Sequence, residues 1–63
     1  MKNIKTIYGD GFYVLVWKGS DDLYYVEMFD SGSCVVFSDY NTQAEALIAA
    51  NLLVALKAVR LFA

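Results

Sequence analysis

The sequence predicts an α+β fold, a three- to four-stranded antiparallel meander followed by one C-terminal helix packed on one face (βββα or ββββα). Two observations lead to this prediction. Runs rich in Val, Tyr, Phe and Trp alternate with Gly, Ser and Asp turn signals over the first 40 residues. The remainder is rich in Ala and Leu, and from residue 42 onward it contains neither Gly nor Pro. With 63 residues in all, residues 1–63 are expected to form a single small domain.

Four strands are expected, at residues 4–8, 12–18, 23–30 and 33–38, and the first has the weakest signal. The turn signals between them lie at residues 9–11, 19–22 and 31–33. If residues 31–32 form a two-residue hairpin loop, Met28 faces Val35. If residues 19–22 form the other loop, Leu15 faces Val26.

This register predicts which side chains share a face, because side chains alternate along a strand. The face expected to lie under the helix consists of Leu15, Trp17, Tyr24, Val26, Met28, Val35 and Phe37. On the opposite face, the surface expected to bind a partner protein consists of Val14, Val16, Tyr25, Phe29 and Val36.

The helix start has the clearest local signal. Thr42 and Glu45 have the spacing of a capping box, in which the threonine oxygen accepts the Glu45 amide and the glutamate reaches back to the Thr42 amide. Lys57 and Arg60 follow near the C-terminal end, where basic residues complement the helix dipole. A helix is therefore expected from this cap to about Leu61.

The predicted helix has more apolar surface than one sheet face can cover. At 100° per residue its apolar arc is about 200°, whereas a stripe of roughly 100° is enough to pack on a sheet. Ile48, Leu52, Leu56 and Val59 are expected to pack on the sheet. The excess flank is expected to form a homodimer interface made of Leu47, Val54, Ala58 and Leu61.

Charge and composition limit the possible partners. Five basic residues against seven acidic ones give a net charge of −2, and the basic residues form no stripe of the kind that tracks phosphates. The longest apolar stretch is shorter than the roughly 20 residues of a membrane span. Neither nucleic acid nor a membrane is therefore expected as a partner. The single Cys34 and the absence of a signal-peptide pattern favour the cytoplasm of the producing or host bacterium.

The residues needed for most catalytic and metal sites are missing. The chain has no histidine and one cysteine, so it cannot build a Ser-His or Cys-His pair or a thiolate-imidazole zinc site. The Asp and Glu residues lack the spacing of a calcium loop. The sequence therefore predicts a chain that is not an enzyme, with no catalytic residues, no metal ligands and no cofactor.

Residues 24–56 resemble the N-terminal domain of HicB-type antitoxins. The resemblance is carried by the residues 24–30, the residues 32–39, and the sequence Thr-Gln-Ala-Glu-Ala-Leu at residues 42–47. It implies a hairpin followed by a capped helix and a tendency to bind protein. The usual Pro-Gly bend and an appended DNA-binding segment are missing from the match, so no DNA-binding role is carried over. In size and architecture the chain also resembles small phage-encoded inhibitor proteins.

Three hypotheses of function follow. The first is a non-enzymatic protein-interaction module of a phage or mobile element, which acts as a homodimer and occludes a host or defence protein. The second is a small-ligand-binding module at a dimer seam or a helix–sheet seam, lined by Trp17, Tyr24 and Tyr25. The third is a structural subunit of a larger assembly.

Overall fold

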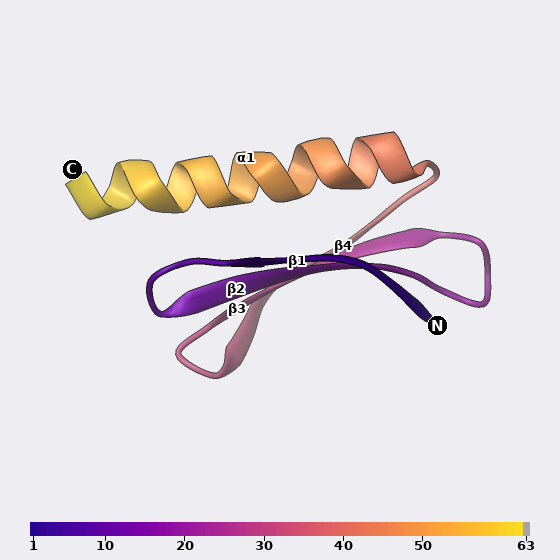
Figure 1. Ribbon diagram of the computed structural model, residues 1–63, viewed down its shortest axis with the longest axis horizontal. Helices are drawn as coiled ribbons and strands as arrows, with labels where there is room; N and C mark the ends of the chain where they lie inside the picture. Colours follow the sequence, from indigo (N-terminus) through magenta and orange to yellow (C-terminus); the bar gives the residue numbers. More distant parts are fainter. Residues whose placement is uncertain (63) are drawn as a thin grey trace.

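The described part of the chain contains four strands and one helix. The computed structural model describes the backbone of residues 1–62 and the side chains of residues 1–57. The elements are β1 (Lys2–Tyr8), β2 (Phe12–Lys18), β3 (Tyr24–Asp30), β4 (Ser33–Tyr40) and α1 (Gln43–Phe62). The strands form one antiparallel sheet in the order β1-β2-β3-β4, and α1 lies along one face of it (Figure 1). The predicted ββββα fold is confirmed.

The core lies between α1 and the two central strands. Val14 and Val16 from β2 and Val26 from β3 are fully buried, because alternate side chains of each strand point toward the helix. Phe12 and Met28 extend the core toward the β1–β2 turn and are also buried. β-branched valines suit this position, since they pack well on a pleated surface that is covered on one side.

The hairpin of β3 and β4 forms as the sequence predicts, with a two-residue loop. Ser31 and Gly32 have φ values of 54° and 84°, and positive φ at both central residues is typical of the type I′ turn, which matches the twist of the flanking strands. Asp30 pairs with Ser33 on either side of this loop.

A bulge then changes the register of β4. Phe29 pairs with Cys34, whereas Met28 pairs with Val36, so Val35 is the extra residue. Every later residue of β4 is thereby moved to the other face. The expected pairing of Met28 with Val35 is wrong: Val36 packs against the core and Phe37 points away from the helix.

The loop between β2 and β3 is one residue longer than expected. It spans residues 19–23, and the Gly19 amide donates to the Leu23 carbonyl at 2.9 Å. Asp22 has φ 64°, a left-handed conformation in which Asp and Asn are enriched.

Because of this extra loop residue, each side chain of β2 lies on the opposite face of the sheet from the one expected. Val16 lies opposite Val26, and Leu15 lies opposite Glu27. A shift of one residue moves every side chain of a strand to the other face. Leu15 and Trp17 therefore lie on the face away from the helix, which corrects their expected placement in the core.

The two edges of the sheet differ in character. The β1 edge carries Lys2 and Lys5 and is interrupted by a bulge between Asn3 and Lys5, both of which disfavour pairing with a further strand. The β4 edge has a single charged residue, Asp39, and an exposed Val35.

The cap of α1 forms at Thr42. The Thr42 Oγ1 accepts the Glu45 amide at 3.2 Å, as the sequence predicts. The Thr42 hydroxyl donates to Glu45 Oε1 at 2.9 Å, so the carboxylate meets the hydroxyl where the sequence predicts the Thr42 amide.

Small residues bring α1 close to the sheet. Ala46 and Ala50 are fully buried against the core, and Leu47, Leu53 and Val54 pack on either side of them. Approach through alanines lets the helix backbone lie near the valines of the sheet, which increases dispersion contacts.

This orientation corrects the expected rotation of the helix. Ile48, Leu52 and Leu56, expected to pack on the sheet, are instead large apolar side chains exposed on α1, and Leu47 and Val54 take their place against the core. The backbone of Ala58, Val59 and Leu61 lies in α1, and their side chains lie outside the described residues.

Candidate functional site

The sheet face opposite α1 is covered by no other element of the described chain (Figure 1). We call it the outer sheet face. Its position follows from the register, because residues paired across the strands share a face. Its central part consists of Tyr13, Leu15, Trp17, Tyr25, Glu27, Phe29 and Phe37.

The aromatic rings of this face contact one another across the strands. Trp17 and Tyr25 stack with ring centroids 4.3 Å apart and an interplanar angle of 15°. Tyr25 also meets Phe37, in a tilted arrangement at 5.6 Å. Nearer the β1–β2 turn, Tyr13 stacks on Phe29 at 5.0 Å. These contacts hold the rings in fixed orientations on the outer sheet face.

Hydrogen bonds fix the polar atoms among these rings. The Trp17 Nε1 donates to Glu27 Oε1 at 2.5 Å. The Tyr25 hydroxyl donates to Asp21 Oδ2, and Asp21 Oδ1 accepts the Leu23 amide at 3.1 Å. The hydrogen bond from Tyr25 lowers the pKa of Asp21, and the same bond raises the pKa of Tyr25.

A shallow hollow opens on the outer sheet face beside Trp17. Its volume is about 280 Å³, and it is lined by Met1, Asn3, Leu15, Trp17 and Glu27. An indole, an aliphatic side chain and a carboxylate thus meet at one place on this surface.

The second apolar surface lies on α1. Ile48, Leu52 and Leu56 are 62%, 59% and 61% exposed, and we call these three residues the helix ridge. Their spacing of four residues places them along one side of the helix, turned away from the buried Ala46 and Ala50. An exposed helix side that carries three large aliphatic residues is typical of a contact surface.

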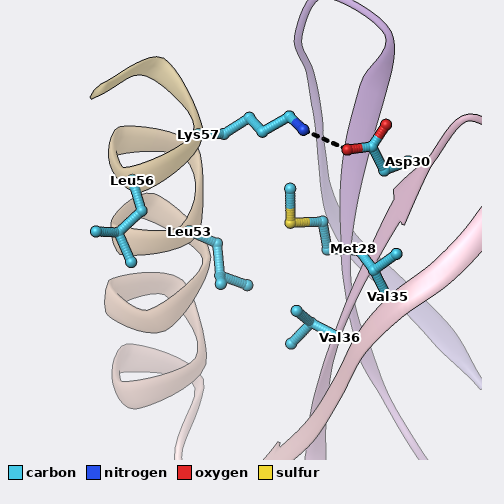
Figure 2. Close-up of a pocket in the computed structure, with 7 residues that line it drawn as sticks. All are labelled: Met28, Asp30, Val35, Val36, Leu53, Leu56 and Lys57. Atoms are coloured by element: carbon cyan, nitrogen blue, oxygen red, sulfur yellow. Dashed lines mark hydrogen bonds and ion pairs between the residues drawn. The ribbon is translucent and has the colours of Figure 1, made fainter. Parts of the chain in front are cut away.

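A groove lies between α1 and the strands β3 and β4. Its volume is about 370 Å³, and Figure 2 shows Leu53 of the helix opposite Met28 and Val36 of the sheet. Lys57 donates to Asp30 at one end of this groove. The ion pair lowers the pKa of Asp30.

The structure separates the residues predicted to bind a partner. Tyr25 and Phe29 lie on the outer sheet face, as expected. Val14 and Val16 are fully buried under α1 and Val36 packs against the core, so their prediction as outer-face residues is wrong. The one-residue shifts in the β2–β3 loop and at Val35 cause these errors.

The residues predicted for the dimer interface are also displaced. Leu47 and Val54 are half-buried against the core, which leaves them little surface for a second chain. Ala58 and Leu61 lie outside the residues whose side chains are described. The exposed apolar side of the helix is the helix ridge, and the signal that would have found it is the pair Ala46 and Ala50, whose small size marks the side nearest the sheet.

The missed residues of the outer sheet face are Tyr13, Leu15, Trp17 and Phe37. No turn residue in the sequence signals the bulge at Val35 that turns Phe37 outward. Leu15 and Trp17 were assigned to the wrong face because Leu23, which belongs to the β2–β3 loop, was counted as part of the strand.

Groups of metal ligands and membrane-spanning helices are absent from the described part of the chain. It contains no group of three or more His, Cys, Asp or Glu side chains arranged to hold a metal ion. None of its helices is long and apolar enough to cross a membrane.

Comparison with known proteins returns no match to a family model, a curated protein or a solved structure. The resemblance of residues 24–56 to HicB-type antitoxin domains therefore stays a prediction from the sequence.

Proposed function

We propose that the chain is a non-enzymatic protein-interaction module, which dimerises through the helix ridge and binds another protein with the outer sheet face. One observation carries the proposal: apolar side chains remain accessible on two opposite surfaces of a very small protein. The helix ridge is exposed on α1, and on the outer sheet face Phe37 is 60% exposed beside half-buried aromatic rings. Monomeric proteins rarely leave such patches uncovered. Binding of this kind acts by occlusion, because the bound chain covers part of the partner's surface and blocks access to it.

The helix ridge suits contact with a second copy. In an antiparallel pair of helices centred on Leu52, Ile48 of each chain meets Leu56 of the other, so the surface is complementary to itself. Exposed Asn51 and Ala55 lie on the adjacent row of the helix, beside which an opposing ridge would pack.

The size of this surface predicts a weak dimer. Together with the adjoining groove, the ridge offers on the order of 500 Å² per chain, which is at the lower end of specific interfaces. Association should therefore depend on concentration in the micromolar range.

Analytical ultracentrifugation of the unmodified chain tests the dimer. Between about 1 and 100 μM the average mass should rise from 7.0 kDa toward twice that value. A mass of 7.0 kDa at every concentration would contradict the dimer, and a species much larger than a dimer would favour a structural subunit.

Binding by the outer sheet face is tested separately, by selecting peptides from a random library on the immobilised chain. Peptides that bind the unmodified chain and lose affinity on Phe37→Lys support the proposal. If every selected peptide binds Phe37→Lys equally well, the outer sheet face is not the binding surface.

The groove favours a second candidate function, the binding of a small apolar ligand. Its volume of about 370 Å³ lies within the usual range of ligand pockets, and Met28, Val36 and Leu53 give it an apolar lining. Titration with octanol, followed by the methyl resonances of these three residues, would reveal such binding. Leu53→Trp fills the groove and should abolish the shifts, and no shift in the unmodified chain would rule the candidate out.

A further inference from the structure

The two sides of the protein differ in charge. Lys18 pairs with Lys2, and Lys5 pairs with the fully buried Val16, so all three lysines project toward the helix side of the sheet. Lys57 belongs to α1 on the same side. The outer sheet face therefore receives none of the lysine side chains.

Acidic residues, by contrast, do project from the outer sheet face. Glu27 lies at its centre, and Asp39 pairs with Tyr25 on the same face. Among residues with described side chains, these two are the charged groups that the strands place there. The surface is aromatic and acidic, which favours a basic partner.

The position of Glu27 makes this preference specific. Leu15 and Phe37 flank it across the strands, and Tyr25 and Phe29 flank it along β3. A carboxylate accepts about four hydrogen bonds, and the described side chains supply it with one, from Trp17. A purely apolar partner would remove water from this carboxylate without pairing it, which is costly. A partner with a cation at this point offsets that cost.

The aromatic rings beside Glu27 favour arginine as the source of the cation. A guanidinium is planar, donates two parallel hydrogen bonds to a carboxylate and stacks on aromatic faces, whereas the lysine ammonium is a compact and strongly hydrated charge. Trp17 and Tyr25 lie beside the carboxylate, and the hollow there has room for a side chain.

A second copy of the chain does not fit this face. In a two-fold pairing of two outer sheet faces, the same acidic patch lies on both sides of the interface, and the like charges repel. The four lysines, which would have to neutralise them, lie on the other side of each chain. The charge distribution therefore assigns this face to a different protein.

We propose that the outer sheet face binds a protein segment that carries an arginine, whose guanidinium pairs with Glu27 beside the Trp17–Tyr25 stack. This inference rests on the proposed function and names the chemistry of the partner. In this arrangement the arginine is the central contact. The aromatic and aliphatic side chains around Glu27 contact apolar residues that flank the arginine, and these surrounding contacts exclude water.

The test uses the peptides selected on the unmodified 63-residue chain. Peptides that bind the Phe37→Lys variant more weakly than the unmodified chain should be enriched in arginine relative to the starting library. For one such peptide, replacing the arginine by citrulline, its uncharged analogue, should weaken binding at least about 10-fold. Binding is followed by the fluorescence of Trp17, the only tryptophan in the chain.

Two variants of the protein complete the test. Glu27→Gln keeps an oxygen that accepts the Trp17 hydrogen bond and removes the charge, so it should weaken binding at least about 10-fold with unchanged circular dichroism. Asp10→Asn is the control: it also removes one negative charge, but in the exposed β1–β2 turn. It should alter affinity less than about 2-fold.

The outcomes separate this inference from the proposed function. Selected peptides that depend on Phe37 and lack enrichment in arginine would overturn the inference and leave the interaction module standing. Equal binding by Glu27→Gln and the unmodified chain would overturn it as well. Absence of any peptide that depends on the outer sheet face would overturn both.

Discussion

Lys57 of α1 donates to Asp30 at the end of β3, and this ion pair joins the helix to the sheet across the open end of the groove (Figure 2). The two residues are 27 positions apart in the sequence, and each side chain is about one quarter exposed. The pair thus links the β3–β4 hairpin to the second half of the helix.

The ion pair predicts a dependence of stability on pH. Because Lys57 lowers the pKa of Asp30 in the folded chain, the unfolded chain takes up a proton at Asp30 at higher pH than the folded chain does. The stabilisation is therefore present above the pKa of the unfolded state and is lost as pH falls through the folded pKa. Asp30→Asn should have a lower melting temperature than the unmodified chain at pH 7, and the difference should vanish once the pH lies below the folded-state pKa of Asp30.

Lys57→Met is the matched control for this prediction, because it removes the other member of the pair. Lys57→Met should also melt at a lower temperature than the unmodified chain at pH 7, and this difference should likewise vanish in acid. Parallel melting profiles of Asp30→Asn and the unmodified chain from pH 7 to acid would show that the pair does not stabilise the fold.

Thr42→Ala should destabilise the chain by about 1 kcal/mol, because it removes the oxygen that accepts the Glu45 amide. Thr42→Ser retains this oxygen and should cost much less. Urea unfolding followed by circular dichroism at 222 nm measures both. Equal stability of the alanine and serine variants would mean that the cap contributes nothing.

Two valine-to-threonine changes test which residues face the helix. Val16 is fully buried, so Val16→Thr places a hydroxyl in the core and should cost about 1–3 kcal/mol. Val35 is 56% exposed, and Val35→Thr should change stability by less than about 0.5 kcal/mol. The register expected from the sequence predicts the reverse order, so urea unfolding of the two variants decides between the registers.

Leu52→Lys should convert the proposed dimer to a monomer, because it places a charge at the centre of the helix ridge. Phe37→Lys adds the same charge to the outer sheet face and should leave the dimer intact. Sedimentation of both variants at one concentration gives the comparison. Loss of the dimer with Phe37→Lys alone would assign self-association to the sheet.

Local signals predicted the elements, and longer-range packing decided their orientation. The bounds of β2 and the cap at Thr42 depend on a few adjacent residues, which is why the sequence predicted them. The pairing of β2 depends on whether Leu23 belongs to the loop or to the strand, and the turn residues before it are compatible with both. One residue then decides whether Trp17 is in the core or on the surface.

The rotation of α1 could not be predicted for a related reason. Its apolar residues extend around more than half of the helix, so hydrophobicity does not distinguish the flank of Ile48 and Leu52 from that of Leu47 and Val54. Shape makes the distinction: Ala46 and Ala50 permit a closer approach to the valines of the sheet than the larger side chains would. The candidate surfaces depend on this rotation and on the β2 register, and for that reason the sequence assigned several of their residues wrongly.

The position of α1 after all four strands has a consequence for the newly made chain. Domains are synthesised from the N-terminus at roughly 5–20 residues per second, so the 20 residues of α1 need about 1–4 s to follow the completed meander. Until then Val14, Val16 and Val26 have no cover, and both faces of the sheet present apolar side chains. The chain is therefore most prone to aggregate before α1 packs on the sheet.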